Sequence, residues 1–242
     1  MNSKSIAIIG ASGVIGTAVA TLLASQGHRL GLHYCSNREP LESIPTSISE
    51  RGPHIVHQSS LSTFDEGRST VSYFQKQLGR LDGLALCAGR VPWKNEDELT
   101  ADDWNDATFE LTSQPYNMAF HFCQICNPKS RIVGLSSISA KYGGSTSSRH
   151  YGAAKAALES SLLGLSRSLY GKEICINIVR AGFILTPQQT RGRSKLEITE
   201  RIMKIPFQRA GRPEEIADLF SFFFGHNASF ITGQCISVAG GD

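Results

Sequence analysis

The sequence has little excess charge and no long apolar run. Its net charge of +3 is too small to indicate binding to nucleic acid or to a membrane surface. No apolar stretch approaches the roughly 20 residues of a membrane-spanning helix. Only four residues precede the first strand-like run, which leaves no room for a signal peptide. We therefore expect neither a nucleic-acid partner nor association with a membrane.

Cysteine is also sparse, and its spacing does not suggest a metal site. The cysteines are Cys35, Cys87, Cys123, Cys126, Cys175 and Cys235. Cys123 and Cys126 form the single CxxC, without a second pair or nearby histidines. Reduced thiols, mostly in apolar stretches, are therefore favoured over zinc binding or redox chemistry. We expect no metal site and a cytoplasmic protein.

Apolar strand-like runs alternate with helical stretches along the whole chain. The runs lie at about 5–9, 29–34, 54–57, 83–87, 130–135, 174–179 and 234–238. The helical stretches lie at about 14–26, 64–78, 100–126, 151–170 and 213–224. This alternation predicts the α/β class: a doubly wound, seven-stranded parallel sheet of the Rossmann type, with helices on both faces. With 242 residues and no repeat or linker, we expect a single domain over 1–242.

A glycine-rich turn follows the first strand-like run. Gly10, Gly13 and Gly16 stand in residues 10–16, directly before a helical stretch that ends at Gly27. Glycine lets the backbone approach a ligand closely, and the free N–H groups and dipole of a helix N-terminus favour an anion. A strand, such a turn and a helix together predict a cradle for a dinucleotide pyrophosphate.

Tyr151 and Lys155 stand one helical turn apart, fourteen residues and more beyond Ser137. A tyrosine hydroxyl normally has a pKa near 10, so it needs help to exchange protons at neutral pH. A cation one turn away favours the phenolate, and we expect Lys155 to lower the pKa of Tyr151. Ser137 can then hydrogen-bond the substrate oxygen that Tyr151 protonates or deprotonates.

The end of the second strand-like run indicates which cofactor the chain prefers. A site for NAD(H) usually places an acidic residue there to hold the ribose hydroxyls. This chain instead has Ser36, Asn37 and Arg38, with no acid before Glu39. These side chains can bond a 2′-phosphate, so NADP(H) is favoured, while NAD(H) is not excluded. The alternative is a solvated turn with an unrelated arginine.

Together these residues resemble the short-chain dehydrogenase/reductase family, over nearly the whole chain. Residues 84–89 resemble the family's NNAG strand end, and 131–137 resemble the strand that carries its catalytic serine. Residues 177–186 are similar to its N-x-x-x-PG-x-I-x-T motif. Residues 206–217 and 231–241 match its C-terminal signatures. Within the family, the chain looks most like reductases of the 3-oxoacyl-carrier-protein type.

The resemblance implies hydride transfer between NADP(H) and a carbonyl or alcohol carbon of a small or carrier-bound substrate. It implies catalytic roles for Ser137, Tyr151 and Lys155. Its expected cofactor-binding residues are Gly10, Ser12, Gly13, Ile15, Gly16, Ser36, Asn37, Arg38, Ser60, Leu61, Cys87, Ala88, Gly89, Tyr151, Lys155, Gly182, Ile184 and Thr186. It also implies a substrate-covering lid at about 187–205.

The lid carries more basic than acidic residues. Its cations are Arg191, Arg193, Lys195, Arg201 and Lys204, against Glu197 and Glu200. This excess can attract an anionic substrate, although a charged run is more often a solvated face. The helical stretch from Tyr151 is apolar over a wide arc, which requires burial on two sides. With the resemblance, this predicts a homotetramer, with a homodimer as the alternative.

Several family positions differ in this chain. The middle glycine usually stands where this chain has Val14; Ser60 and Leu61 replace an adenine-contacting Asp; and Leu86 and Cys87 replace Asn-Asn. Ala181 replaces a proline, and Leu111 replaces a catalytic Asn. These losses leave open a nucleotide-binding regulator or scaffold without turnover.

One residue near Leu111 offers a replacement for the missing asparagine. Pro115 has no N–H to close the helical bond onto the carbonyl of residue 111. An unpaired buried carbonyl recruits water or distorts the helix. Our hypothesis is that Pro115 keeps open the water site of the proton relay. The alternative is that Pro115 only kinks or ends the helix.

Overall fold

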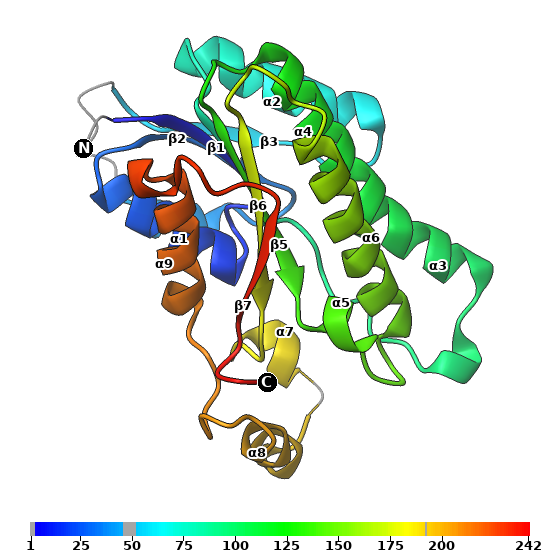
Figure 1. Ribbon diagram of the computed structural model, residues 1–242. Coiled ribbons are helices and arrows are strands. Elements are labelled where there is room, and N and C mark those ends of the chain that lie inside the picture. The colour runs from blue at the N-terminus through cyan, green and yellow to red at the C-terminus, as the bar shows by residue number, and fades with distance from the viewer. Residues whose placement is uncertain (1–2, 46–51, 192) are drawn as a thin grey trace.

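Seven parallel strands form one continuous sheet in the computed structural model, which describes residues 3–45, 52–191 and 193–242. The strands are β1 (Ser5–Ile9), β2 (Arg29–Tyr34), β3 (Ile55–Gln58), β4 (Gly83–Leu86), β5 (Arg131–Ser137), β6 (Cys175–Ala181) and β7 (Gln234–Val238). Their order is β3-β2-β1-β4-β5-β6-β7. The first three strands are therefore added towards one edge of the sheet and the last four towards the other, and the order switches between β1 and β4. The predicted doubly wound fold is confirmed (Figure 1).

Helices cover both faces of this sheet (Figure 1). They are α1 (Val14–Ser25), α2 (Phe64–Leu78), α3 (Ala101–Thr108), α4 (Gln114–Ile125), α5 (Ser139–Tyr142), α6 (Arg149–Ser166), α7 (Pro187–Thr190), α8 (Lys195–Met203) and α9 (Pro213–Phe224). Helices α1 and α9 pack on one face, and α2, α4 and α6 pack on the other. Short 3-10 turns lie at Glu39–Ser43, Glu96–Glu98 and His226–Ala228.

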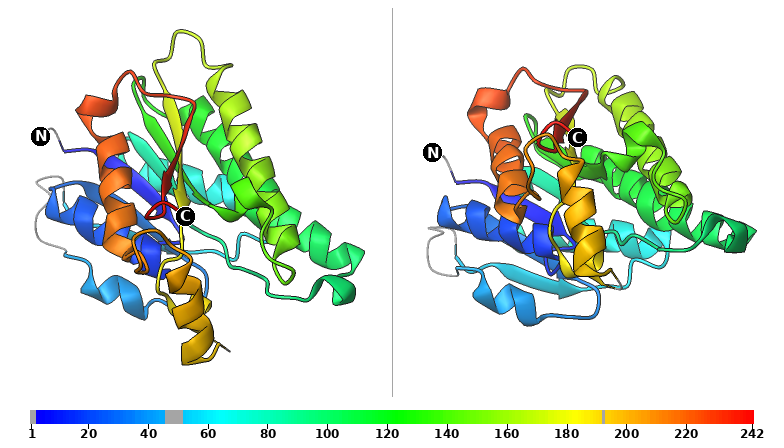
Figure 2. Two further views of the ribbon diagram at one scale, coloured as in Figure 1. Left: turned by 60° about the horizontal axis from the view of Figure 1, so that its bottom comes forward. Right: turned by 90° about the horizontal axis from the view of Figure 1, so that it is seen from below.

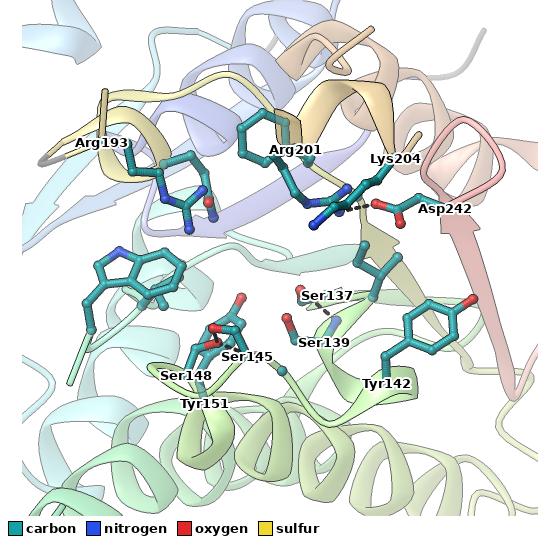
Figure 3. A pocket seen from close by; sticks show the side chains of 17 residues that line it. Ser137, Ser139, Tyr142, Ser145, Ser148, Tyr151, Arg193, Arg201, Lys204 and Asp242 are labelled. Carbon is teal, nitrogen blue, oxygen red and sulfur yellow. Dashed lines mark hydrogen bonds and ion pairs between the residues drawn. The ribbon is translucent and has the colours of Figure 1, made fainter. Parts of the chain in front are cut away.

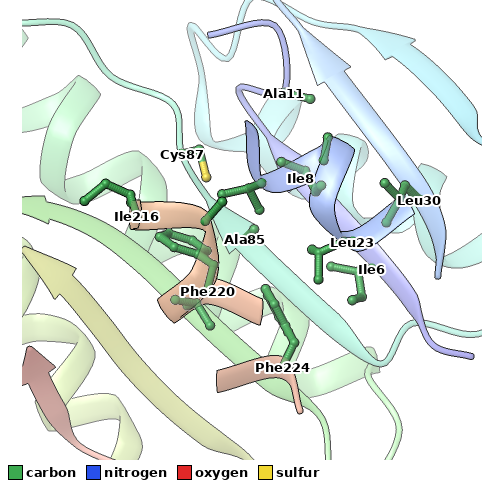
Figure 4. Packing of buried hydrophobic residues seen from close by; sticks show 14 of the residues in the cluster. Ile6, Ile8, Ala11, Leu23, Leu30, Ala85, Cys87, Ile216, Phe220 and Phe224 are labelled. Atoms are coloured by element: carbon green, nitrogen blue, oxygen red, sulfur yellow. The ribbon is translucent and has the colours of Figure 1, made fainter. Parts of the chain in front are cut away.

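Alternate residues of the central strands point into two separate apolar layers. In β1, Ile6 and Ile8 pack with α1 and α9, where Phe220 and Phe224 are fully buried (Figure 4). Ala7 and Ile9 point the other way, towards α2, α4 and α6. Because both faces are covered, the strands read as continuous apolar runs, which is why their positions could be predicted.

The helix expected at 100–126 is interrupted. Helix α3 ends at Thr108, a π-helical segment spans Phe109–Ser113, and α4 starts directly before Pro115. The N–H of Gln114 donates to the carbonyl of Phe109, five residues back, which is the π-helical pattern. The next residue, Pro115, has no N–H to donate. The helix expected at 151–170 runs instead over Arg149–Ser166. At its end, backbone N–H groups donate to carbonyls three residues back, as in a 3-10 helix, and this tightens the last turn.

All six cysteines are free thiols, and Cys35 is the exposed one. Burial raises the pKa of the Cys87 and Cys123 thiols to about 12, so both stay protonated at neutral pH. In the part of the chain that the structure describes, no helix is both long and apolar enough to cross a membrane.

A buried histidine fixes the glycine turn, and no motif in the sequence indicated it. The Gly10 N–H donates to Nδ1 of His33 at 3.1 Å, so Nε2 carries the proton and donates to the Ser59 carbonyl at 2.9 Å. Burial lowers the pKa of His33 to about 4, which keeps the ring neutral. One neutral imidazole therefore ties the end of β1 to the segment after β3.

Gly16 allows α1 to approach the turn. A Cβ at position 16 would lie 2.1 Å from the Gly10 carbonyl oxygen, whereas one at Gly13 would lie 3.4 Å from the same atom. We expect Gly16→Ala to lower the free energy of unfolding by roughly 3 kcal/mol, because backbone must move to admit the methyl group. Gly13→Ala, in the same turn, is the control and should cost clearly less in urea unfolding. Equal losses would contradict this packing argument.

Candidate active site

Strand β5 and helix α6 bring the three predicted catalytic residues together. Ser137 is the last residue of β5, and its Oγ accepts a hydrogen bond from the Ser139 N–H at 3.1 Å, where α5 begins. Tyr151 and Lys155 lie one turn apart on α6. The Ser137 hydroxyl lies close enough to that of Tyr151 to act on its pKa. Hydroxyls from two different elements thus meet at the carboxyl end of the sheet.

The pKa of Tyr151 departs from the sequence expectation. Burial raises it, and the nearby Ser137 hydroxyl only partly offsets that rise. Lys155 does not lower it here, because the Lys155 Nζ donates to the Leu135 carbonyl at 2.9 Å and lies 6.0 Å from the centre of the Tyr151 ring. The phenol therefore keeps its proton at neutral pH and is ready to donate it.

Lys155 is almost completely buried, with 3% of its surface exposed. Burial lowers its pKa to about 8, against the smaller opposing effects of Cys87, Glu110 and Glu159. Its ammonium therefore titrates close to neutral pH. Such a shift is typical of functional lysines, although structural burial produces it too.

A buried ion pair holds α6 against the sheet, and sequence reasoning missed it. Glu159, one turn beyond Lys155, binds Arg180 of β6 through two bonds, at 2.8 and 2.6 Å. The Ser136 Oγ donates to the same carboxylate at 2.6 Å. A single glutamate on a mostly apolar face of α6 was the one signal in the sequence that could have found it.

Two cavities meet at Ser137 and Tyr151. One, of about 340 Å³, runs along the glycine turn and the ends of β4 and β5. The other, of about 430 Å³, lies between α5, α8 and the start of α6 (Figure 3). The residues that line both are Val91, Ser137, Tyr151, Gly182 and Gln189. The predicted proton donor therefore faces the crevice along the glycine turn on one side and a second cavity on the other.

The smaller cavity gathers most of the predicted cofactor residues. They are Ser12, Gly13, Ile15, Gly16, Cys87, Ala88, Gly89, Tyr151, Lys155, Gly182 and Thr186. Seven predicted positions do not line it, namely Gly10, Ser36, Asn37, Arg38, Ser60, Leu61 and Ile184. Of these, Gly10 underlies the turn, and Ile184 is 97% buried in the core beside α9 (its exposed fraction is 3%).

The residues present fit a dinucleotide. Helices α2, α3 and α8 are capped by the side chains of Thr63, Thr100 and Ser194, but Gly13 caps α1 without a side chain. The first N–H groups of α1 therefore face the cavity with no side-chain acceptor of their own, as a pyrophosphate site requires. The glycine turn and this helix end would hold the phosphates of a bound dinucleotide, and Lys155 and Tyr151 would lie beside its nicotinamide half.

Outside the cavity, the adenosine side is less complete. Ser36, Asn37 and Arg38 are exposed, and within the described residues Arg38 forms no ion pair. The Ser60 hydroxyl instead donates to the Glu66 carboxylate, at 3.0 and 2.9 Å, within the cap of α2. The Leu61 side chain packs into the core against α2, and its carbonyl accepts a bond from Gln114.

Leu111 lies in the π-helical segment and is buried beside Gly89 and Tyr151. Thr112, next to it, donates to the Ala154 carbonyl at 2.6 Å and joins this segment to α6. The distortion that Pro115 was expected to cause is therefore present, while the water site remains a prediction. His150 lines neither cavity: it is buried and packs edge-on against Trp104, with ring centres 6.2 Å apart.

The predicted lid contains two short helices, α7 and α8, and residue 192 within it lies outside the described residues. Figure 2 shows α8 projecting beyond the carboxyl ends of the strands. The sequence did contain a signal for α8: Ser194 and Glu197 form a capping box. The indole N–H of Trp93 donates to the Gln188 carbonyl at 3.3 Å and fastens the start of this segment to the loop after β4.

Comparison with known proteins extends over the same region. A family model described as enoyl-(acyl carrier protein) reductase matches residues 10–242. The chain is 32% identical to the uncharacterized oxidoreductase YmfI of Bacillus subtilis, covering 99% of this chain and 98% of that one. It is 31% identical to a 3-oxoacyl-(acyl-carrier-protein) reductase of Rickettsia conorii, covering 100% and 97%. A short-chain dehydrogenase of Burkholderia cenocepacia, solved in complex with NADP, superposes with a TM-score of 0.89 at 25% identity, covering 99% and 97%.

The buried Lys155 should make stability depend on pH. The unfolded chain keeps its proton up to a pKa of 10.5, the folded chain only up to about 8, so unfolding takes up a proton between these values. The free energy of unfolding of the wild type, relative to Lys155→Met, should therefore rise with pH from 8 towards 10.5, by up to about 3 kcal/mol. Urea unfolding at pH 7 and 10 measures this. A difference in unfolding free energy between wild type and Lys155→Met that is the same at both pH values would contradict this prediction. Lys195→Met, at an exposed lysine, controls for the lost charge.

Proposed function

Because the chain belongs to the short-chain dehydrogenase/reductase family of oxidoreductases, we propose that it transfers a hydride between NADP(H) and a carbonyl or alcohol carbon. One observation carries this proposal: Ser137 and Tyr151 line both the crevice along the glycine turn and the second cavity, and Lys155 lines the crevice. A substrate carbonyl in the second cavity would reach the hydroxyls of Ser137 and Tyr151 and face the crevice at once.

In the direction of reduction, the nicotinamide when bound supplies the hydride to the carbonyl carbon. The Tyr151 hydroxyl donates its proton to the carbonyl oxygen, and the alcohol forms. Ser137 holds that oxygen by a hydrogen bond while charge develops on it. Lys155 lines the crevice beside Tyr151, where it would hold the nicotinamide half of the cofactor. The reverse sequence oxidises an alcohol.

The proton donor can be tested against a second tyrosine of the same cavity. Tyr151→Phe should lower kcat roughly 100- to 10,000-fold, because the variant has no proton to transfer. The dissociation constant for NADPH should change little. Tyr142→Phe is the matched control: Tyr142 also lines the larger cavity, but it is 57% exposed. The assay is loss of absorbance at 340 nm with a panel of ketones and quinones.

The same assay separates the reductase from the alternative function. A nucleotide-binding regulator or scaffold would bind NADPH tightly and turn over none of the acceptors. The altered positions at Leu111, Cys87 and Ser60 favour that alternative. The intact Ser137 and Tyr151 at the junction of the cavities, with Lys155 in the crevice, favour the enzyme. Equal activity of wild type and Tyr151→Phe would also count against the proposed mechanism.

We propose NADP(H) as the preferred cofactor, and the exposed Arg38 after β2 supports it, since no acid stands between Tyr34 and Glu39. Its guanidinium can pair with a 2′-phosphate. Arg38→Ala should raise the dissociation constant for NADPH roughly tenfold and leave that for NADH unchanged. Fluorescence titration of both nucleotides measures this, and NADH serves as the internal control. Tighter binding of NADH than of NADPH by the wild type would overturn the preference.

We also propose a cytoplasmic homotetramer, or a homodimer as the smaller alternative, acting on a small or carrier-bound substrate. The free thiols support a reducing compartment. On the outer face, α4 exposes 46% of Phe120, and the neighbouring α6 exposes the small residues Ala153 and Ala157. Two adjacent helices with such a surface suit close packing against a second copy. Light scattering that gives the 26.3 kDa mass of one chain would contradict this.

A further inference from the structure

The roof of the larger cavity is cationic. Arg193, Arg201 and Lys204 point into it from above, opposite Ser139, Ser145 and Ser148 (Figure 3). Among the described residues that line this cavity, Asp242 is the single acidic one. Three basic side chains and one acidic side chain thus line the cavity that also holds the predicted proton donor. Charges that line a cleft act on its occupant more strongly than charges on an open surface.

Aromatic rings hold two of these cations in place. The Arg193 guanidinium lies 4.8 Å from the centre of the Trp93 ring, and that of Arg201 lies 5.4 Å from the centre of Phe183. A guanidinium stacked on a ring is positioned by its face, and its N–H edges stay available. Those edges match the planar oxygens of a carboxylate or the oxygens of a phosphate.

The charges of this roof are only partly balanced within the described residues. Arg201 is paired with Asp242, which fixes its position at the end of α8. Glu197 lies close enough to Arg193 for their charges to interact, but its carboxylate accepts the N–H and Oγ of Ser194 in the cap of α8. Lys204 forms no ion pair there. Arg193 and Lys204 therefore supply the positive charge that an occupant would meet.

The structure also divides the five basic residues of this segment. Arg193, Arg201 and Lys204 line the cavity, whereas Arg191 and Lys195 do not. The sequence alone could not separate a substrate site from a solvated charged face. The position of three cations inside the cavity, with two left outside, makes that separation and provides matched control positions.

We propose that Arg193 and Lys204, with Arg201 held by Asp242, form a subsite for an oxyanion of the substrate. The natural substrate is then a small ketone or alcohol that carries a carboxylate or a phosphate. Val91, Trp93, Ile138, Tyr142 and Phe183 form the apolar walls, so the part of the substrate between its two polar ends is apolar. A cavity of about 430 Å³ suits a molecule of this size. This inference rests on the proposed reduction at Tyr151.

The first test compares acids with neutral analogues. The probes are oxo acids with one to four methylene groups between ketone and carboxylate, each with its methyl ester, and dihydroxyacetone phosphate with dihydroxyacetone. For the wild type, kcat/KM for the best charged probe should exceed that for its neutral partner at least tenfold. The arm with the larger ratio identifies carboxylate or phosphate as the anion. Ratios near one for every pair, with the neutral ketones turned over, would overturn the subsite and leave the reductase standing.

Variants then locate the effect. Arg193→Gln and Lys204→Gln should each lower the charged-to-neutral ratio roughly ten- to hundredfold, because a charge-assisted hydrogen bond is lost. Arg191→Gln and Lys195→Gln remove the same charge from the same segment outside the cavity, and they should leave the ratio unchanged. An equal fall in all four variants would show a general field of the segment and would overturn the subsite.

A binding measurement decides the matter without turnover. Ligand-observed NMR titration should show benzoate binding at least tenfold more tightly than benzamide, at constant ionic strength. Arg193→Gln should remove most of this preference, and Arg191→Gln should retain it. Equal binding of the two probes would overturn the subsite. If no ketone in any arm is reduced but this preference is present, the proposed reductase fails and the oxyanion subsite stands.

Discussion

One buried carboxylate sets the position of the helix on which the candidate chemistry depends. Glu159 receives two bonds from Arg180 of β6 and one from Ser136 of β5, so α6 is fastened to two neighbouring strands at once. Tyr151 and Lys155 stand two turns and one turn before it on the same helix. A buried ion pair adds little net stability by itself, because desolvation offsets its attraction, but it allows few other arrangements of the helix. Its value here lies in alignment.

Burial then gives the two titrating groups opposite behaviour. The same desolvation raises the pKa of the Tyr151 phenol and lowers that of the Lys155 ammonium to about 8, because it disfavours whichever form is charged. The pair therefore tends towards a neutral phenol beside a cation that is easily neutralised.

Local patterns in the sequence predicted the sheet, the glycine turn and the Ser137–Tyr151–Lys155 group, since each depends on spacing within one or two adjacent elements. Features that depend on distant partners were missed. The bond from Gly10 to His33 and the pairing of Glu159 with Arg180 join residues that only the fold brings together. The pKa of Tyr151 was predicted in the wrong direction because burial, set by tertiary packing, outweighs a neighbour one turn away.

The segment that carries α7 belongs to both cavities. Thr186, Pro187 and Gln188 line the crevice beside the glycine turn, and Gln189 lines both that crevice and the cationic cavity. The Trp93 indole fastens this shared wall to the loop after β4. A ligand that rearranged this wall from one side would rearrange it for the other cavity too. Thermodynamic reciprocity requires that any resulting change in affinity be the same factor for both ligands.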